Sequence, residues 1–292
     1  MTGMEGWTRL GLIAGGGDLP VHVAEAAKAS GRLACTIALR GFADPSRFDS
    51  PVMRSVAQLG QVVKDLKTAQ CDAVCFAGIV TRPDFSALKP DLKGMAFLPK
   101  ALAAAARGDD ALLRAIVGFF EKEGFLVVGA NDIADQLLVG PGVLGAVSPS
   151  PEILADGVKA LHIAGVSGAE DIGQGAVVCD GLVLAVEAQE GTDAMLARVA
   201  GLPAEIRGSE TARKGVLAKR PKPNQERRVD LPVIGVSTVE GAARAGLAGI
   251  VIPAGGALVL GRDAVSAAAD AAGLAVWAVD LEESGDERAP GG

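Results

Sequence analysis

Apolar, strand-like segments alternate with helical patterns through residues 1–135, and this alternation constrains the fold more than any other feature. The strand-like runs are TRLGLIAG (8–15), LACTIALRG (33–41), CDAVCFAGIV (71–80) and FLVVGAN (125–131). The helical patterns lie between them, at 20–30, 61–69, 98–107 and 111–123. Strands that are apolar on both faces and separated by helices indicate a parallel sheet covered on both sides. We therefore predict an α/β fold whose N-terminal domain, residues 1–135, is Rossmann-like.

The second half has another pattern, which predicts a second α/β domain with a mixed sheet over residues 151–280. Its clearest signal is GAVVCDGLVLAVEA (175–188), two apolar strands joined by Asp180-Gly181, a pair favoured in two-residue hairpin turns. Residues 136–150 carry no charge but three glycines and two prolines, so we expect them to link the domains. The tail, residues 281–292, is polar and is expected to be disordered.

Composition excludes several functions. The net charge is −7, aromatic residues make up 3% and tyrosine is absent, so no nucleic-acid role is expected. The four cysteines form no CxxC pair, which argues against a zinc site and suits a reduced, cytoplasmic protein. No apolar run approaches the length of a membrane span and no signal peptide is recognisable, so any membrane contact is expected to be peripheral.

The scarcity of histidine narrows the chemistry further. Only His22 and His162 occur, each inside a predicted helix. A di-metal phosphoesterase built on several histidines is therefore excluded, and no Ser-His-Asp relay is indicated. The Walker pattern of P-loop kinases is absent as well.

A glycine-rich turn, LIAGGGDLP, follows the first predicted strand and leads into a helix. Gly15, Gly16, Gly17 and Asp18 could bring backbone N–H groups to a phosphate at the positive end of that helix. A tight structural turn is the alternative. A nicotinamide-dependent oxidoreductase is disfavoured, because Pro20 replaces the third glycine of the dinucleotide motif and no acid follows the second strand.

Two further loops carry candidate ligand-binding residues. Thr81 and Arg82 follow the strand at 71–80, at the edge where open α/β sheets bind ligands, although an exposed loop would look the same. In EAQEGTDAML, Glu187, Glu190 and Thr192 could bind polar groups of a substrate. Glu187 or Glu190 could instead bind a cation. Helix capping is the simpler explanation for the residues around Thr192.

The stretch KPNQERRVDLP (222–232) closes a basic segment in a chain that is acidic overall. Eight cations lie between Arg207 and Arg228, which suggests a polyanion nearby. Glu226 and Asp230 lie four residues apart within the same segment. Because Mg²⁺ commonly bridges one or two carboxylates and phosphate oxygens, these acids are candidate metal ligands. A surface loop of paired charges is the alternative.

These motifs together resemble a known family. GLIAGGGDLP, GIVTRP, EGTDAML, KPNQERRVDLPVIG and AGLAGIVIPAGGALVLGRD occur in the order seen in the UDP-2,3-diacylglucosamine diphosphatase of the non-calcineurin type. The resemblance implies hydrolysis of this lipid-linked UDP-sugar to UMP and 2,3-diacylglucosamine 1-phosphate (lipid X) in lipid A biosynthesis. It also implies dependence on Mg²⁺ (or Mn²⁺), water attack at the α-phosphorus and two domains. Peripheral contact with the inner membrane and a homodimer are compatible with it. A non-catalytic nucleotide-sugar sensor remains the alternative function.

On this resemblance, the site residues take distinct roles. The expected metal ligands are Glu226 and Asp230, and the expected diphosphate contacts are Lys222, Gln225 and Arg228. The nucleotide end is assigned to Gly15, Gly16, Gly17, Asp18, Thr81 and Arg82. One position departs from the family pattern, which usually has aspartate where this chain has Glu226.

Overall fold

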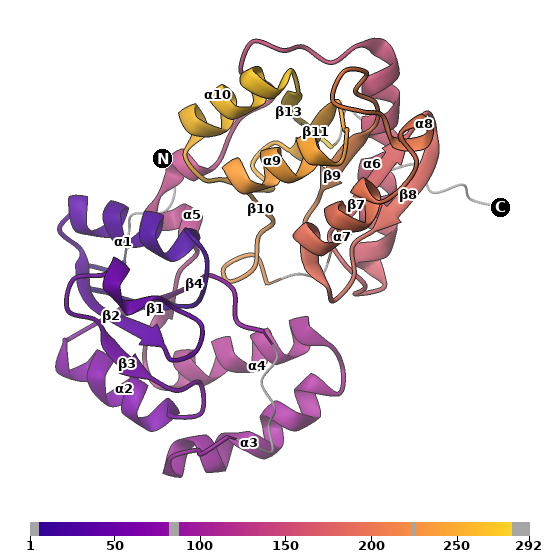
Figure 1. Ribbon diagram of the computed structural model, residues 1–292. Coiled ribbons are helices and arrows are strands. Elements are labelled where there is room, and N and C mark those ends of the chain that lie inside the picture. Colours follow the sequence, from indigo (N-terminus) through magenta and orange to yellow (C-terminus); the bar gives the residue numbers. More distant parts are fainter. Residues whose placement is uncertain (1–5, 82–87, 224–225, 282–292) are drawn as a thin grey trace. The chain divides into compact units, whose positions relative to one another are not determined.

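The structure is a computed structural model that describes residues 6–81, 88–223 and 226–281 (Figure 1). The chain forms two compact units. The first comprises Met1–Asp135 together with Glu226–Asp230, and the second comprises Gln136–Gln225 together with Leu231–Gly292. Among the described helices, none is both long enough and apolar enough to cross a membrane.

The first unit contains a five-stranded parallel sheet in the order β3-β2-β1-β4-β5, which confirms the Rossmann-like prediction (Figure 1). Its strands are β1 (Leu10–Ala14), β2 (Leu33–Leu39), β3 (Val52–Arg54), β4 (Ala73–Ala77) and β5 (Leu126–Val127). Its helices are α1 (Leu19–Ala29), α2 (Leu59–Thr68), α3 (Leu92–Ala105), α4 (Asp109–Lys122) and α5 (Ala130–Ile133), with one 3-10 turn at Pro45–Arg47.

Helices cover the sheet of the first unit in layers. Val62 and Leu66 of α2 and Phe120 of α4 bury their side chains against Ile13 and Val74 of the central strands. Helix α1 contacts β1, β2 and β4, whereas α3 packs on α2 and α4. Burial of such side chains contributes roughly 1.5–3 kcal/mol each. These layers hold the carboxyl ends of β1 and β4 in fixed positions.

Helix α3 begins six residues earlier than the sequence pattern predicts. The Asp91 side chain accepts a hydrogen bond from the Gly94 N–H at 2.8 Å, which caps the helix and starts it at Leu92. Pro99 lies inside the helix rather than at its first turn. The short strand β3 is a second difference, since three half-buried residues leave no recognisable periodicity.

The second unit contains a six-stranded mixed sheet in the order β6-β13-β11-β9-β7-β8, as predicted. Its strands are β6 (Gly142–Leu144), β7 (Gly175–Cys179), β8 (Leu182–Val186), β9 (Val216–Lys219), β11 (Gly249–Pro253) and β13 (Ala275–Val279), with β10 (Val233–Ile234) and β12 (Leu258–Val259) forming a separate parallel pair. Its helices are α6 (Pro151–Ala169), α7 (Gly191–Ala200), α8 (Ala204–Arg207), α9 (Val236–Arg244) and α10 (Arg262–Ala272). A 3-10 turn at Asp135–Leu137 joins the units.

The predicted hairpin is present between β7 and β8. Asp180 has a φ of 48° and Gly181 a φ of 75°, as a tight two-residue hairpin turn requires. The segment GIVIPAGGALVLG (249–261) forms β11 and β12 on either side of Gly255-Gly256, but β12 pairs with β10 and not with β11.

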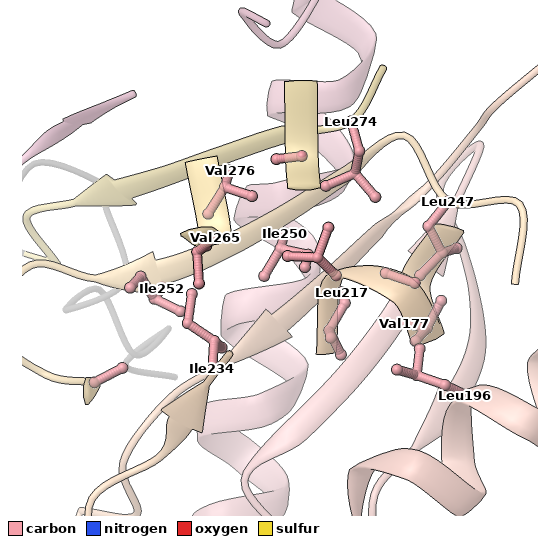
Figure 2. Close-up of a cluster of buried hydrophobic side chains, with 14 of the residues drawn as sticks. Val177, Leu196, Leu217, Ile234, Leu247, Ile250, Ile252, Val265, Leu274 and Val276 are labelled. Atoms are coloured by element: carbon pink, nitrogen blue, oxygen red, sulfur yellow. The ribbon is translucent and has the colours of Figure 1, made fainter. Parts of the chain in front are cut away.

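Two cores hold the sheet of the second unit. Leu161 of α6 packs with Trp277 and Val251 on one face. On the other face, Leu196 of α7 and Val265 of α10 join Leu217, Ile250, Val276 and their neighbours in the larger cluster of Figure 2. The sheet is therefore covered on both sides, which agrees with its apolar strands.

Residues 136–150, expected to be a linker, belong to the packed part of the second unit. β6 pairs antiparallel with β13, and Val139 and Leu144 are buried in the larger core. The apolar composition of this segment reflects that burial. In contrast, residues 226–230, expected in the 151–280 domain, lie with the first unit. Val229 is the physical reason, since it packs on the core of the parallel sheet.

Candidate active site

The glycine turn and the residues that follow β4 meet at the carboxyl edge of the first sheet. The N–H of Gly15 donates to the Ala77 carbonyl, and Gly16 and Ile79 exchange backbone hydrogen bonds of 2.8 and 2.9 Å. A Cβ at Gly15 would lie 2.7 Å from the Ile79 carbonyl oxygen. This close approach requires glycine and uses the N–H groups of Gly15 and Gly16. The point between β1 and β4 is also where the strand order reverses, the usual ligand position in such sheets.

The neighbouring candidates at this edge are more open. Gly17 has a φ of 84°, a conformation that favours glycine. Asp18 is the N-cap residue of α1, but its carboxylate pairs with the Arg47 guanidinium at 2.9 Å and caps no backbone N–H. Thr81 is exposed, and Arg82 lies outside the described residues. Ligand contacts of these residues stay predictions.

The segment 226–230 is held on the first unit by side-chain and backbone contacts. Val229 packs on the apolar core, and the Glu226 N–H donates to Asp110 Oδ1 at 3.1 Å. The N–H groups of Val229 and Asp230 both donate to the Glu226 carbonyl, at 3.0 and 3.1 Å. Glu226 and Asp230 are therefore carried on one tight turn of the backbone.

Charge pairing dominates this turn. The Arg228 guanidinium grips the Glu226 carboxylate with two hydrogen bonds of 2.9 Å and donates a third to Glu121 at 2.8 Å. The Glu226 carboxylate is only 17% exposed. Arg228 holds the pKa of Glu226 below its ordinary value, and the two carboxylates raise the pKa of Arg228. Glu226 is thus anionic over the whole neutral range.

The donor set at this turn matches a hard cation in kind. Carboxylate oxygens are the ligands that Mg²⁺ takes, and it commonly uses only one or two of them with the rest from phosphates and water. No group of three or more His, Cys, Asp and Glu side chains that could hold a metal occurs among the described residues. The residues therefore suit a cation completed by a phosphate ligand, with Arg228 as the competing partner of Glu226.

Four other cations of the basic segment have separate structural partners in the second unit. Lys222 belongs to the second unit, where its ammonium pairs with Asp171 at 2.6 Å. Arg207 donates to the Leu202 carbonyl, Arg213 to the Ala243 carbonyl, and Lys214 pairs with Asp180. These three serve the second unit locally and do not gather around one polyanion. Gln225 lies outside the described residues.

A buried polar cluster in the second unit brings together Lys219, Thr192 and Glu187. Lys219 ends β9, Thr192 lies in the first turn of α7, and Glu187 follows β8. The Lys219 ammonium donates to Thr192 Oγ1 at 2.8 Å and to the Val233 carbonyl at 3.2 Å. The Thr192 hydroxyl in turn donates to Glu187 Oε1 at 2.8 Å. We call these three residues the Lys-Thr-Glu cluster.

The Lys-Thr-Glu cluster places opposite charges where water is largely excluded. Lys219 is 5% exposed and Glu187 is 6% exposed. Glu187 Oε2 is buried and has no hydrogen-bond partner among the described residues. A Cβ at Gly175 would lie 2.5 Å from this oxygen, so glycine makes room for the carboxylate. A buried carboxylate oxygen without a donor costs free energy, which is typical of functional sites.

Sequence patterns identify this cluster only in part. Thr192 is among the predicted substrate-binding residues, and Glu187 is considered as an alternative to Glu190. Glu190 instead pairs with Arg198 at 2.6 Å on the surface. Lys219 has no assigned role among the eight cations, although a lysine that ends the buried strand VLAK is the signal that could have found it.

Comparisons with known proteins agree over most of the chain. Residues 9–137 match the family model of the LpxI N-terminal domain, and residues 140–277 match that of the LpxI C-terminal domain. A curated protein of Caulobacter vibrioides, UDP-2,3-diacylglucosamine pyrophosphatase LpxI, is 57% identical over 276 residues, which cover 94% of this chain and 99% of that protein. The chain belongs to the LpxI family.

Proposed function

We propose that this chain is an enzyme of lipid A biosynthesis that hydrolyses the pyrophosphate of UDP-2,3-diacylglucosamine. The products are UMP and 2,3-diacylglucosamine 1-phosphate, or lipid X. The activity named for the Caulobacter relative and the agreement of both family domains support this reaction. Because the substrate carries acyl chains, we further propose that the enzyme works in the cytoplasm at the surface of the inner membrane.

The chemical step is the hydrolysis of the phosphoanhydride bond between the two phosphorus atoms of the diphosphate. The water oxygen forms a bond to the α-phosphorus, and the bond between this phosphorus and the bridging oxygen breaks. The electron pair of the broken bond stays on the bridging oxygen, which leaves with the sugar as its 1-phosphate. The attacking water loses a proton during the step. The protein must therefore neutralise the diphosphate and orient the water.

The Lys-Thr-Glu cluster is the observation that carries the residue assignment. A lysine ammonium is a compact charge suited to phosphate oxygens, and a nearly water-free setting strengthens that attraction. Thr192 and the Val233 carbonyl hold the Lys219 ammonium in place, while Glu187 orients the Thr192 hydroxyl. We assign Lys219 to the diphosphate of the substrate, Thr192 to positioning it, and Glu187 to positioning Thr192.

The turn at 226–230 is the proposed metal site. Glu226 and Asp230 would hold Mg²⁺, or Mn²⁺ in its place. Arg228 would then move from Glu226 and contact a phosphate oxygen of the substrate. Mg²⁺ supplies neutralisation of the diphosphate when bound. The bidentate grip of Arg228 keeps Glu226 ionised and preset for a cation. We keep Lys222, Gln225 and Glu190 as further predicted contacts of the substrate.

The nucleotide end is proposed to lie at the carboxyl edge of the first sheet. Gly17, Asp18, Thr81 and Arg82 remain the candidates there. The support is the switch point between β1 and β4, next to which Gly17, Asp18 and Ile79 are exposed.

The decisive experiment measures UMP released from UDP-2,3-diacylglucosamine by the pure protein, with Mg²⁺ or with a chelator. We expect UMP with Mg²⁺ and a loss of at least a hundredfold with the chelator. Asp230→Asn should be as impaired as the chelated enzyme. Release of no UMP under any metal would support the sensor alternative instead, and full activity of Asp230→Asn would refute the metal assignment.

The lysine assignment needs its own control. Lys219→Gln is expected to lower kcat/KM by about a hundredfold or more, as loss of a single charge-stabilising donor does in other enzymes. Lys159→Gln is the matched variant, because Lys159 is exposed in the same unit and donates to the Gly181 carbonyl. Equal activity of the two variants would exclude Lys219 from the site.

A further inference from the structure

Helix α3 presents an apolar face to solvent. Leu92, Met95 and Leu102 are 79%, 53% and 45% exposed. Spacings of three and four residues place them on one side of the helix, together with exposed small residues. The α3 stripe consists of Leu92, Met95, Ala96, Pro99, Leu102, Ala103 and Ala106. The stripe runs along the whole helix, from its first residue to its C-cap residue.

The opposite face of α3 already has its packing partners. Gly94, Ala101 and Ala105 are buried, and α3 contacts α2 and α4. The Phe97 ring lies 5.1 Å from the Phe119 ring of α4. In Figure 1, α3 is on the outer side of these two helices. The core of the first unit thus accounts for the inner face of α3 and leaves its stripe without a structural role.

Positive charges run beside the α3 stripe. Lys93 and Lys100 are seven residues apart, so they lie along one edge of the helix. Lys89 precedes the helix and Arg107 follows it. Lys93 pairs with Glu123, which also forms a salt bridge of 3.1 Å with Lys67. Two cations thus share one carboxylate.

The same segment is almost free of negative charge. Between residues 88 and 107 the sequence contains one acid, Asp91. Its carboxylate accepts N–H groups of Gly94 and Gln61, each at 2.8 Å. A segment with one capping acid and four cations stands out in a chain whose net charge is −7.

Helix α6 shows that exposed apolar residues alone do not make this pattern. Leu154, Val158 and Val166 are 43%, 51% and 53% exposed along α6. Exposed Glu152 and Glu170 lie at the two ends of that helix. An anionic surface would repel these acids, whereas it would attract the cations beside the α3 stripe.

We propose that α3 lies flat on an anionic phospholipid surface, with the α3 stripe among the acyl chains and its row of cations among the headgroup phosphates. An apolar face flanked by lysine and arginine is the pattern of helices that bind in the plane of a membrane interface. The inference deepens the proposed function, because a lipid substrate requires the enzyme to reach a bilayer.

The test uses empty vesicles, so its outcome does not depend on whether the enzyme releases UMP. Full-length protein is floated with vesicles of phosphatidylcholine alone or with added phosphatidylglycerol. We expect binding to the vesicles that contain phosphatidylglycerol, and loss of that binding at high salt. Absence of binding to these vesicles would overturn the proposal.

Paired variants separate the two parts of the surface. Leu92→Gln with Leu102→Gln should weaken vesicle binding at least tenfold. Lys100→Gln with Arg107→Gln should weaken it by about fivefold per cation. Leu154→Gln with Val158→Gln on α6 is the matched control and should bind like the wild type. Because all the altered side chains are exposed, thermal melting should stay close to that of the wild type.

Rival occupants of the stripe give different results. If the stripe holds the acyl chains of the substrate, the leucine variant loses activity on detergent-dispersed substrate and binds empty vesicles normally. If it joins a second copy of the chain, light scattering shows a dimer that the leucine variant loses. Either result, or equal vesicle binding by the α3 and α6 variants, would overturn membrane docking.

Discussion

Thr192→Val tests whether the Lys-Thr-Glu cluster is a working part of the enzyme. Valine has nearly the shape of threonine but neither donates nor accepts a hydrogen bond. The change removes the 2.8 Å bond from the Lys219 ammonium and the 2.8 Å bond to Glu187 Oε1. Glu187 then has no donor on either oxygen among the described residues, because Oε2 already lacks one.

The magnitude follows from the two bonds that are lost. Hydrogen bonds to charged groups contribute roughly 1.5–3 kcal/mol each. Since Lys219 keeps its 3.2 Å bond to the Val233 carbonyl and can turn toward Glu187, part of the loss is recovered. We expect the free energy of unfolding to fall by about 2–3 kcal/mol. A displaced ammonium should also lower kcat/KM by about a hundredfold, the effect of losing one oriented donor.

Urea denaturation and UMP release at saturating Mg²⁺ measure the two effects on the same preparation. Thr192→Ser, which restores the hydroxyl without the methyl group, should recover most of both quantities. A merely structural role would lower the denaturation midpoint while leaving the kcat/KM of the folded fraction intact. If Thr192→Val has a kcat/KM within a factor of two of the wild type and the same urea midpoint, the assignment of the cluster is refuted.

Three other predictions address the fold and its ionisable groups. Gly15→Ala should lower the free energy of unfolding by about 1–3 kcal/mol, since its Cβ would lie 2.7 Å from a carbonyl oxygen. Gly118→Ala, inside α4 with nothing within 4 Å, should raise it by about 0.5–1 kcal/mol, and equal urea midpoints would contradict both. Because Arg228 lowers the pKa of Glu226, the stability that Glu226 adds is complete above its ordinary value of 4.5 and is lost as the pH falls through the lower folded value. The difference in the free energy of unfolding between wild type and Glu226→Gln should shrink on acidification. A difference that grows as the pH falls would contradict this prediction. Burial raises the pKa of the Cys71 thiol to about 12, so iodoacetamide at pH 8 should leave it unmodified until urea is added, as mass spectrometry can show.

Local patterns were sufficient to predict most of the elements. Apolar strands between helices predicted the parallel sheet of the first unit, and Asp180-Gly181 predicted the hairpin of the second. Both depend on neighbours in sequence: the period of apolar residues and the φ values that a turn requires. The exceptions are the short strand β3 and the start of α3, where a cap formed by Asp91 decides the boundary.

The candidate site depended more on contacts between distant residues. Sequence spacing identifies Glu226 and Asp230 as a pair of acids, but it cannot show that Arg228 also pairs with Glu121 or that Lys219 is buried beside Thr192. These contacts are made when strands and helices far apart in the chain pack together. The alternation of strands and helices, in contrast, can be predicted from the sequence, because the periodicity of apolar residues is local.

What only the tertiary structure decided is which core each segment joins. KPNQERRVDLP reads as one charged loop, yet Lys222 lies in the second unit and residues 226–230 in the first. Contacts with the first unit make the difference, because Val229 packs against its core and Arg228 pairs with Glu121. By itself the sequence determined two α/β units and a family, since these follow from periodic burial and ordered motifs. The partners of each charge were decided by packing, because burial selects which charges must be paired.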